Sequence, residues 1–172
     1  MIVAETTRTK MELRLNKTSR ETIQAAEAQG LKVVYSYEYD APSLPKDITD
    51  ITEEQLMDLY SRYVSYLDFI NTQAWCAKVD AADTEKELVL DKARKKIMMK
   101  EAGQAVAMID SHVEIDEGYV DLQNTCQELK NYHSLVQLIS EKTLKDISFI
   151  NREISRRISA NKATGRLAMF TP

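Results

Sequence analysis

Residues that break regular structure are scarce in this chain. Its 172 residues include only four glycines and three prolines. So few of them argue against a turn-rich β fold and favour long helices. Apolar residues make up 44% of the chain, which is enough to build a core. The sequence therefore predicts a mainly helical protein of one domain, or of a small domain with an arm.

The residues that most often carry chemistry are also few. The two cysteines, Cys76 and Cys126, fit a reducing compartment, and we expect them to lie too far apart for a disulfide. The two histidines, His112 and His133, lack the spacing of metal ligands. The sequence has no glycine-rich phosphate loop, no Gly-x-Ser-x-Gly and no Cys-x-x-Cys. We therefore expect no catalytic residue, no cofactor and no metal, in a protein that is not an enzyme.

Long apolar runs and an excess of positive charge are missing as well. No stretch approaches the roughly 18 apolar residues of a membrane span, and the first residues lack the apolar core of a signal peptide. We expect no membrane partner and a location inside a cell, without secretion. The net charge of −4 argues against a generally basic nucleic-acid binder, although it leaves room for local basic patches.

One long predicted helix, from Thr52 to Glu101, organises the chain. Its apolar and small residues recur at alternating steps of four and three, which places them on one seam, as in a coiled coil. The seam consists of Leu56, Tyr60, Tyr63, Leu67, Ile70, Ala74, Ala77, Ala81, Thr84 and Leu88. Thr52 and Gln55 have the spacing of a capping box, and Ile51 and Leu56 that of a hydrophobic staple. The helix is therefore expected to begin directly after Thr52.

A second periodic run predicts another long helix, from about Gly118 to Ala160. Between the two helices, Gly103 interrupts the pattern. Residues 104–116 fit either a turn with a short helical piece or a continuation of the first helix. Two long helices joined there most simply form an antiparallel hairpin. The predicted fold is thus an all-α core with a coiled-coil-like, two-helix hairpin over residues 50–163, followed by a short tail over 164–172.

Residues 1–49 differ from the rest and predict a small N-terminal β/α arm. Its expected strand, helix and second strand span residues 11–15, 19–29 and 33–39. Thr18 and Glu21 have the spacing of a capping box for the helix, and Gly30 suits its C-terminal cap. Two arrangements are open: a strand–helix–strand unit, or an extended arm that orders only against a neighbouring subunit.

Large apolar side chains extend beyond the one stripe that a two-helix hairpin buries on each helix. This predicts either a bundle with more helices or a multi-subunit ring or sheath, and we expect neighbouring subunits to cover them in a homo-oligomer. The predicted oligomer interface consists of Tyr35, Tyr37, Tyr39, Tyr66, Phe69, Trp75, Leu135, Leu138 and Phe149. The three arm tyrosines would also suit a platform for stacked bases, but one packed face of a strand explains them more simply.

The C-terminal end of the second helix is rich in positive charge. This basic run consists of Arg152, Arg156, Arg157, Lys162 and Arg166. Arginines one helical turn apart present their guanidinium groups on one face, which suits contact with nucleic-acid phosphates. The simpler interpretation, which we favour, is that they offset the helix dipole and lie beside Glu53, Glu54 and Asp58 of the first helix. A second basic patch runs from Lys92 to Lys100, at the other end of the hairpin.

A long helix, a charged turn and a second long helix that ends in Asn-Arg-Glu-Ile-Ser-Arg-Arg follow one another over residues 52–160. This order resembles small helical proteins of tailed bacteriophages. Residues 56–96 and 119–157 are similar in pattern to the recombination-mediator family of T-even-like phages, which implies rings that bind single-stranded DNA. Extended arms are typical of phage virion and head–tail assembly proteins too. The resemblance implies a location in the host cytoplasm or the assembled virion.

Two functions follow as expectations. The first is a non-enzymatic, oligomeric, phage-like structural or assembly protein, whose hairpin packs against neighbouring subunits and whose partners are further copies and other virion or phage proteins. The alternative is a recombination accessory protein that binds single-stranded DNA through the basic run.

Overall fold

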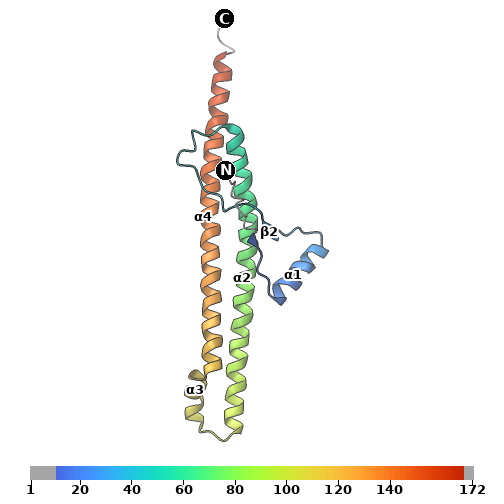
Figure 1. The fold of residues 1–172 in the computed structure, drawn as a ribbon, viewed down its shortest axis with the longest axis vertical. Coiled ribbons are helices and arrows are strands. Elements are labelled where there is room, and N and C mark those ends of the chain that lie inside the picture. The colour runs from blue at the N-terminus through green and yellow to red at the C-terminus, as the bar shows by residue number, and fades with distance from the viewer. Residues whose placement is uncertain (1–10, 169–172) are drawn as a thin grey trace, which may run out of the picture. The chain divides into compact units, whose positions relative to one another are not determined.

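The computed structural model describes residues 11–168, with side chains described as far as Lys162. The elements in these residues are β1 (Met11–Glu12), α1 (Lys17–Ala28), β2 (Ser36–Tyr37), α2 (Glu53–Glu101), α3 (Val106–Glu114) and α4 (Glu117–Ala168). The long helices α2 and α4 lie side by side, and the two short strands belong to the N-terminal arm (Figure 1). The predicted all-α core, with its hairpin and its small β/α arm, is therefore confirmed.

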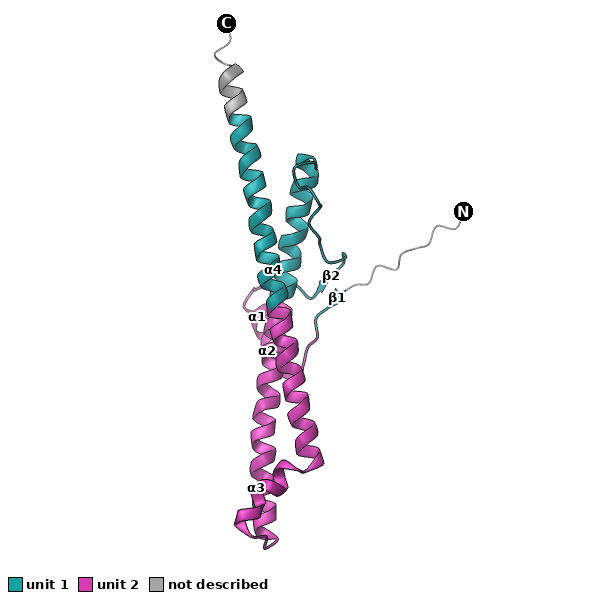
Figure 2. Ribbon diagram, turned by 90° about the vertical axis from the view of Figure 1, so that its left-hand side faces the viewer, with its two compact units in different colours: residues 1–13, 34–71, 138–172 teal, residues 14–33, 72–137 magenta. Residues whose placement is uncertain are grey.

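The chain divides into two compact units, and each contains a stretch of both long helices (Figure 2). Unit 1 consists of residues 1–13, 34–71 and 138–172, and unit 2 of residues 14–33 and 72–137. The polar pairs that bridge the hairpin are Tyr63–Asp146 and Asn71–Ser140 in unit 1, and Glu85–Lys130 and Lys95–Asp116 in unit 2. In both units the residue number rises along α2 as it falls along α4, so the two helices are antiparallel.

The core of unit 1 forms where the predicted seam of α2 meets α4. Leu56 and Tyr63 from α2 are buried together with Ile147 and Ile150 from α4, and Ile48 from the preceding linker completes the cluster. Burial first, and then the neighbouring Asp146, raise the pKa of the Tyr63 hydroxyl to about 12. The seam that the heptad-like spacing predicts is thus the packed face of α2.

Both ends of α2 follow from local sequence. The backbone N–H of Thr52 donates to the Gln55 side chain (2.9 Å), and the backbone N–H of Gln55 donates to the Thr52 hydroxyl (3.2 Å). The predicted capping box is therefore confirmed. At the other end, Gly103 takes a φ of +79°, which favours glycine. The short helix α3 follows, so of the two alternatives for residues 104–116 the turn with a helical piece is right.

The arm has the predicted order of strand, helix and strand, with shorter strands. β1 and β2 pair antiparallel, with Met11 opposite Tyr37. The predicted cap of α1 is wrong: Asn16 is the N-cap, and it forms a capping box with Ser19, while Thr18 lies inside the helix. Asparagine at this position accepts from the backbone N–H of Ser19 at 2.7 Å, so the helix begins two residues earlier than Thr18 would place it.

The end of α4 also differs from the prediction. The helix continues through Ala168, whereas the sequence pattern ends it near Ala160. The apolar periodicity stops there, but no proline follows before position 172. A single glycine such as Gly165 costs a helix only about 1 kcal/mol relative to alanine. Loss of the apolar pattern therefore does not mark the end of the helix. Residues 169–172 of the predicted tail lie outside the described residues.

Candidate functional site

Three of the residues predicted to contact other subunits are covered by the chain itself. Tyr37 packs against Tyr66 and Phe69 of α2, with ring centroids 5.1 Å and 6.4 Å away. All three side chains are buried, and the Tyr37 hydroxyl donates to the backbone carbonyl of Arg62 (3.3 Å). The expectation that a neighbouring subunit must cover them is wrong, because the arm folds back onto α2 and removes these rings from solvent.

The other predicted interface residues are exposed. Tyr35, Tyr39, Leu138 and Phe149 in unit 1, and Trp75 and Leu135 in unit 2, are between 38% and 62% exposed. Single exposed apolar residues are common on protein surfaces. The informative feature is their arrangement, and in unit 1 two of them share one face of α4.

That face is a stripe of two apolar and three positively charged side chains. Leu138, Lys142, Lys145, Phe149 and Arg152 recur at steps of four and three, so they lie along one side of α4, and all five are exposed. We call these five residues the α4 stripe. Within the residues that the structure describes, none of its three cations forms an ion pair. Among the described residues the cations of the stripe therefore have no acidic partner, and its two apolar side chains are exposed.

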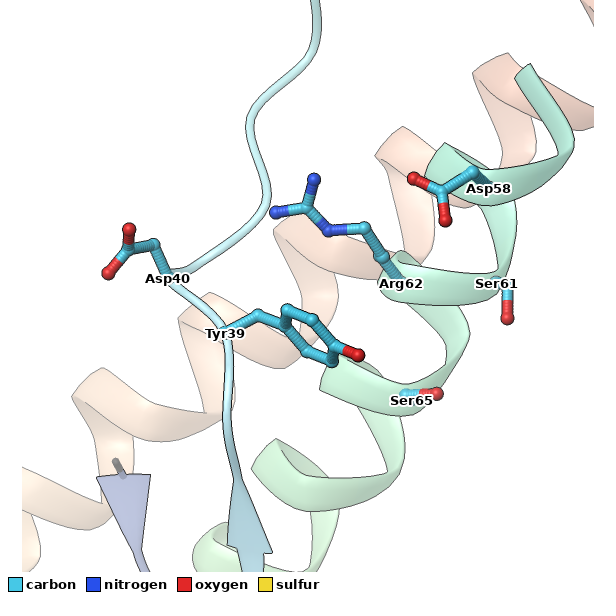
Figure 3. A pocket seen from close by; sticks show the side chains of 6 residues that line it. All are labelled: Tyr39, Asp40, Asp58, Ser61, Arg62 and Ser65. Atoms are coloured by element: carbon cyan, nitrogen blue, oxygen red, sulfur yellow. The ribbon is translucent and has the colours of Figure 1, made fainter. Parts of the chain in front are cut away.

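A polar pocket lies on α2 of the same unit, beneath the chain that leads away from β2. It is lined by Tyr39, Asp40, Asp58, Ser61, Arg62 and Ser65 (Figure 3). Arg62 extends from α2 toward this linker, and its guanidinium carbon lies 5.7 Å from the centre of the Tyr39 ring. Its Nε is buried and has no hydrogen-bond partner among the residues that the structure describes. The pocket thus presents a guanidinium held by a cation–π contact, with one carboxylate on either side.

A second pocket adjoins the first and shares Asp58 and Arg62 with it. Its other lining residues are Ser43, Leu44, Pro45, Ile51, Glu54, Gln55 and Leu59. We call the two pockets together the α2 groove. Three carboxylates (Asp40, Glu54 and Asp58) and one guanidinium give its lining a formal charge of −2. The groove therefore combines an apolar stretch with an acidic rim, which suits a ligand that carries both apolar and cationic groups.

Two arginines of the predicted basic run, Arg156 and Arg157, are engaged within the chain. Glu153 is buried and accepts two hydrogen bonds from Arg156 and one from Arg157, all at 2.7 Å. Arg157 also donates to the carbonyls of Ile48 (3.0 Å) and Thr49 (3.3 Å). The hydrogen bonds from Arg156 and then Arg157 lower the pKa of Glu153 to about 2.

The expected association of the arginines with Glu53, Glu54 and Asp58 is therefore replaced by a cluster around Glu153. The single acidic residue among five cations was the sequence signal for this cluster. Of the remaining residues in the run, Arg152 and Lys162 are exposed, and the side chain of Arg166 lies outside the described residues.

The second basic patch is largely neutralised as well. In unit 2, Lys95 pairs with Asp91 (2.9 Å) and with Asp116, and Lys92 pairs with Glu114 (3.2 Å). Lys96 pairs with Asp110. Because most of these acidic residues lie on α3 or at the start of α4, the pairs tie the turn of the hairpin to α2. Lys92, Lys95 and Lys96, which the sequence presents as part of a basic patch, therefore form ion pairs that stabilise the fold.

The comparisons with known proteins give no match. No protein-family model matches the chain, and neither a curated protein nor a solved structure does. Within residues 11–168, no group of three or more His, Cys, Asp or Glu side chains could hold a metal ion. In the same part of the chain, every helix falls short of the length or the apolar character needed to cross a membrane.

Proposed function

We propose that this chain is a non-enzymatic assembly protein, whose helical hairpin packs against further copies of itself. The observation that carries the proposal is the α4 stripe. The arm covers Tyr66 and Phe69 of α2, yet Leu138 and Phe149 of the stripe remain 62% and 48% exposed. Apolar residues at helical spacing on an uncovered face are typical of a helix that packs against another helix.

The finer part of the proposal concerns the setting. The order of long helix, turn and long helix, with an arm in front, resembles small helical proteins of tailed bacteriophages. Under this proposal the assembly belongs to a phage-like virion or its morphogenesis, and the other partners are virion or phage proteins. This part is supported only by the sequence pattern.

Binding of single-stranded DNA is the second candidate function. One observation favours it: Lys142, Lys145 and Arg152 lie on one face of α4 without ion-pair partners in the described residues. Such a face can contact phosphates. Against it stand the ion pairs of Lys92, Lys95, Lys96, Arg156 and Arg157 within the chain. The assembly role is therefore the better supported of the two.

Native mass measured by light scattering tests both functions. The protein is run over a range of concentrations, with and without a single-stranded oligonucleotide, at low and moderate salt. An assembly protein gives a mass above the 19.7 kDa of one chain, and this mass does not respond to the oligonucleotide. A chain that stays monomeric throughout and takes up oligonucleotide at low salt would overturn the assembly role in favour of DNA binding.

A further inference from the structure

The two long helices carry opposite charges in unit 1. Residues 51–71, the start of α2, hold four carboxylates and one arginine, for a formal charge of −3. Residues 138–162 of α4 hold six cations and three carboxylates, for a formal charge of +3. The packed seam between the helices is apolar. The opposite charges therefore face outward on two different surfaces of the same chain.

The acidic surface is the α2 groove. Among the described residues, Asp40, Glu54 and Asp58 form no ion pairs. They surround an apolar stretch in which Leu44 and Leu59 are only half buried. An apolar side chain flanked by cations would fill this stretch and pair with its rim.

The composition of the α4 stripe complements that of the α2 groove. Phe149 stands between Lys145 and Arg152 along one side of the helix, four and three residues away. Leu138 continues the row beyond Lys142, one turn before it. The stripe thus offers a large ring with a cation on each side, and the groove offers half-buried apolar side chains with carboxylates on its rim. The two surfaces are complementary in both respects.

We propose that the α4 stripe of one copy docks into the α2 groove of a neighbouring copy. Phe149 lies against the apolar pocket, and Lys145 and Arg152 pair with Glu54 and Asp58 of the neighbour. The proposal rests on the assembly role and names the surfaces that perform it. Because the two surfaces differ, the contact is heterologous, and repetition produces a closed ring or an open filament.

Paired charge reversal tests the contact. The variant K145E/R152E places carboxylates opposite carboxylates and should raise the dissociation constant of the assembly roughly tenfold or more. The variant E54K/D58K should do the same from the other side. Combining all four substitutions in one chain restores opposite charges and should restore the mass of the wild-type assembly. The readouts are native mass over a range of concentrations, and circular dichroism to show that each variant keeps its helices.

A matched control changes charge away from both surfaces. Lys32 and Lys78 are exposed in unit 2, so K32E/K78E alters net charge by the same amount as K145E/R152E. This control should assemble like the wild type.

Raising salt from about 50 mM to about 500 mM should weaken the wild-type assembly, since it screens exposed charge pairs.

The outcomes separate this inference from the function on which it rests. A wild-type chain that is monomeric at every concentration overturns both. A wild-type assembly that K145E/R152E leaves intact overturns the proposed contact and leaves the assembly role standing. If K145E/R152E loses assembly and the fourfold variant does not regain it, the proposed pairing is overturned as well. If K145E/R152E instead abolishes uptake of a single-stranded oligonucleotide by a monomer, the α4 stripe is a nucleic-acid surface and the docking proposal is wrong.

Discussion

At the scale of single residues, Glu153 joins two arginines of α4 into one cluster. It sits in a helical segment rich in arginine, and its burial lets one carboxylate hold two guanidinium groups. Through Arg157 it also fixes the backbone of Ile48 and Thr49 just before α2. Removing a buried carboxylate from its charged hydrogen-bond partners strongly destabilises a fold, because the partners then lose their counter-charge.

Replacing Glu153 with glutamine should lower the melting temperature at neutral pH. The pKa of Glu153 in the folded chain is about 2, below the ordinary 4.5. A lowered carboxyl pKa stabilises the fold above the ordinary value, and this contribution is lost as the pH falls through the folded value. The difference in melting temperature between wild type and E153Q should therefore narrow between about pH 4.5 and pH 2, when followed by circular dichroism.

The control for this substitution is E141Q on the same helix. Glu141 is exposed and has no ion pair in the described residues. The E141Q substitution should change the melting temperature little at any pH. An E153Q variant whose difference from the wild type is the same at pH 7 and pH 2.5 would show that the carboxylate charge does not stabilise the cluster.

At the scale of elements, the arm and α2 depend on each other. The two-residue strands β1 and β2 are too short to be stable alone. Tyr37 of β2 joins them to the hairpin by stacking on Tyr66 and Phe69. Burial raises the pKa values of Tyr37 and Tyr66, in keeping with an environment that excludes water. β2 of the arm therefore packs as part of the interior of unit 1.

Replacing Phe69 with alanine should destabilise the protein by about 3–5 kcal/mol, the usual cost of removing a buried aromatic ring. The matched control is Phe149→Ala, because Phe149 is the same residue type and is 48% exposed. In dilute protein the control should change the free energy of unfolding by no more than about 0.5 kcal/mol. Denaturant unfolding measures the free energy of unfolding of both variants. Equal costs for the two variants would contradict the packing of the arm on Phe69.

At the scale of the whole molecule, any assembly must be held together without covalent bonds through cysteine. Cys76 and Cys126 are both free and buried. Burial first, and then the nearby Asp80, raise the pKa of the Cys76 thiol to about 11, which keeps it protonated at neutral pH. Neither sulfur is presented to another copy.

A thiol reagent should therefore detect almost no reactive cysteine in the native protein near pH 7.5, and two after denaturation. A non-reducing gel should show a single chain even where light scattering shows an assembly. Rapid reaction of one thiol in the native state would mean that the helices around it open readily. A disulfide-linked dimer on the gel would contradict the burial of both cysteines.

The sequence by itself determined the helices, because the signals for a helix are local. The steps of three and four, the Thr52–Gln55 capping box and the glycine at position 103 lie within a few residues of what they control. The antiparallel hairpin followed from the length of the two helices and the short connection between them. The absence of a disulfide between Cys76 and Cys126 followed from the same geometry.

Only the tertiary structure decided which side chains are free. Tyr66 and Phe69 looked uncovered, but a strand almost thirty residues earlier in the chain packs on them. Lys95 and Lys96 looked like a basic patch, but Asp116, just before α4, and Asp110 of α3 neutralise them. Burial and charge pairing join residues far apart in the sequence, so no local pattern reports them. The α4 stripe and the α2 groove could be recognised only once the fold had shown which side chains it covers and pairs.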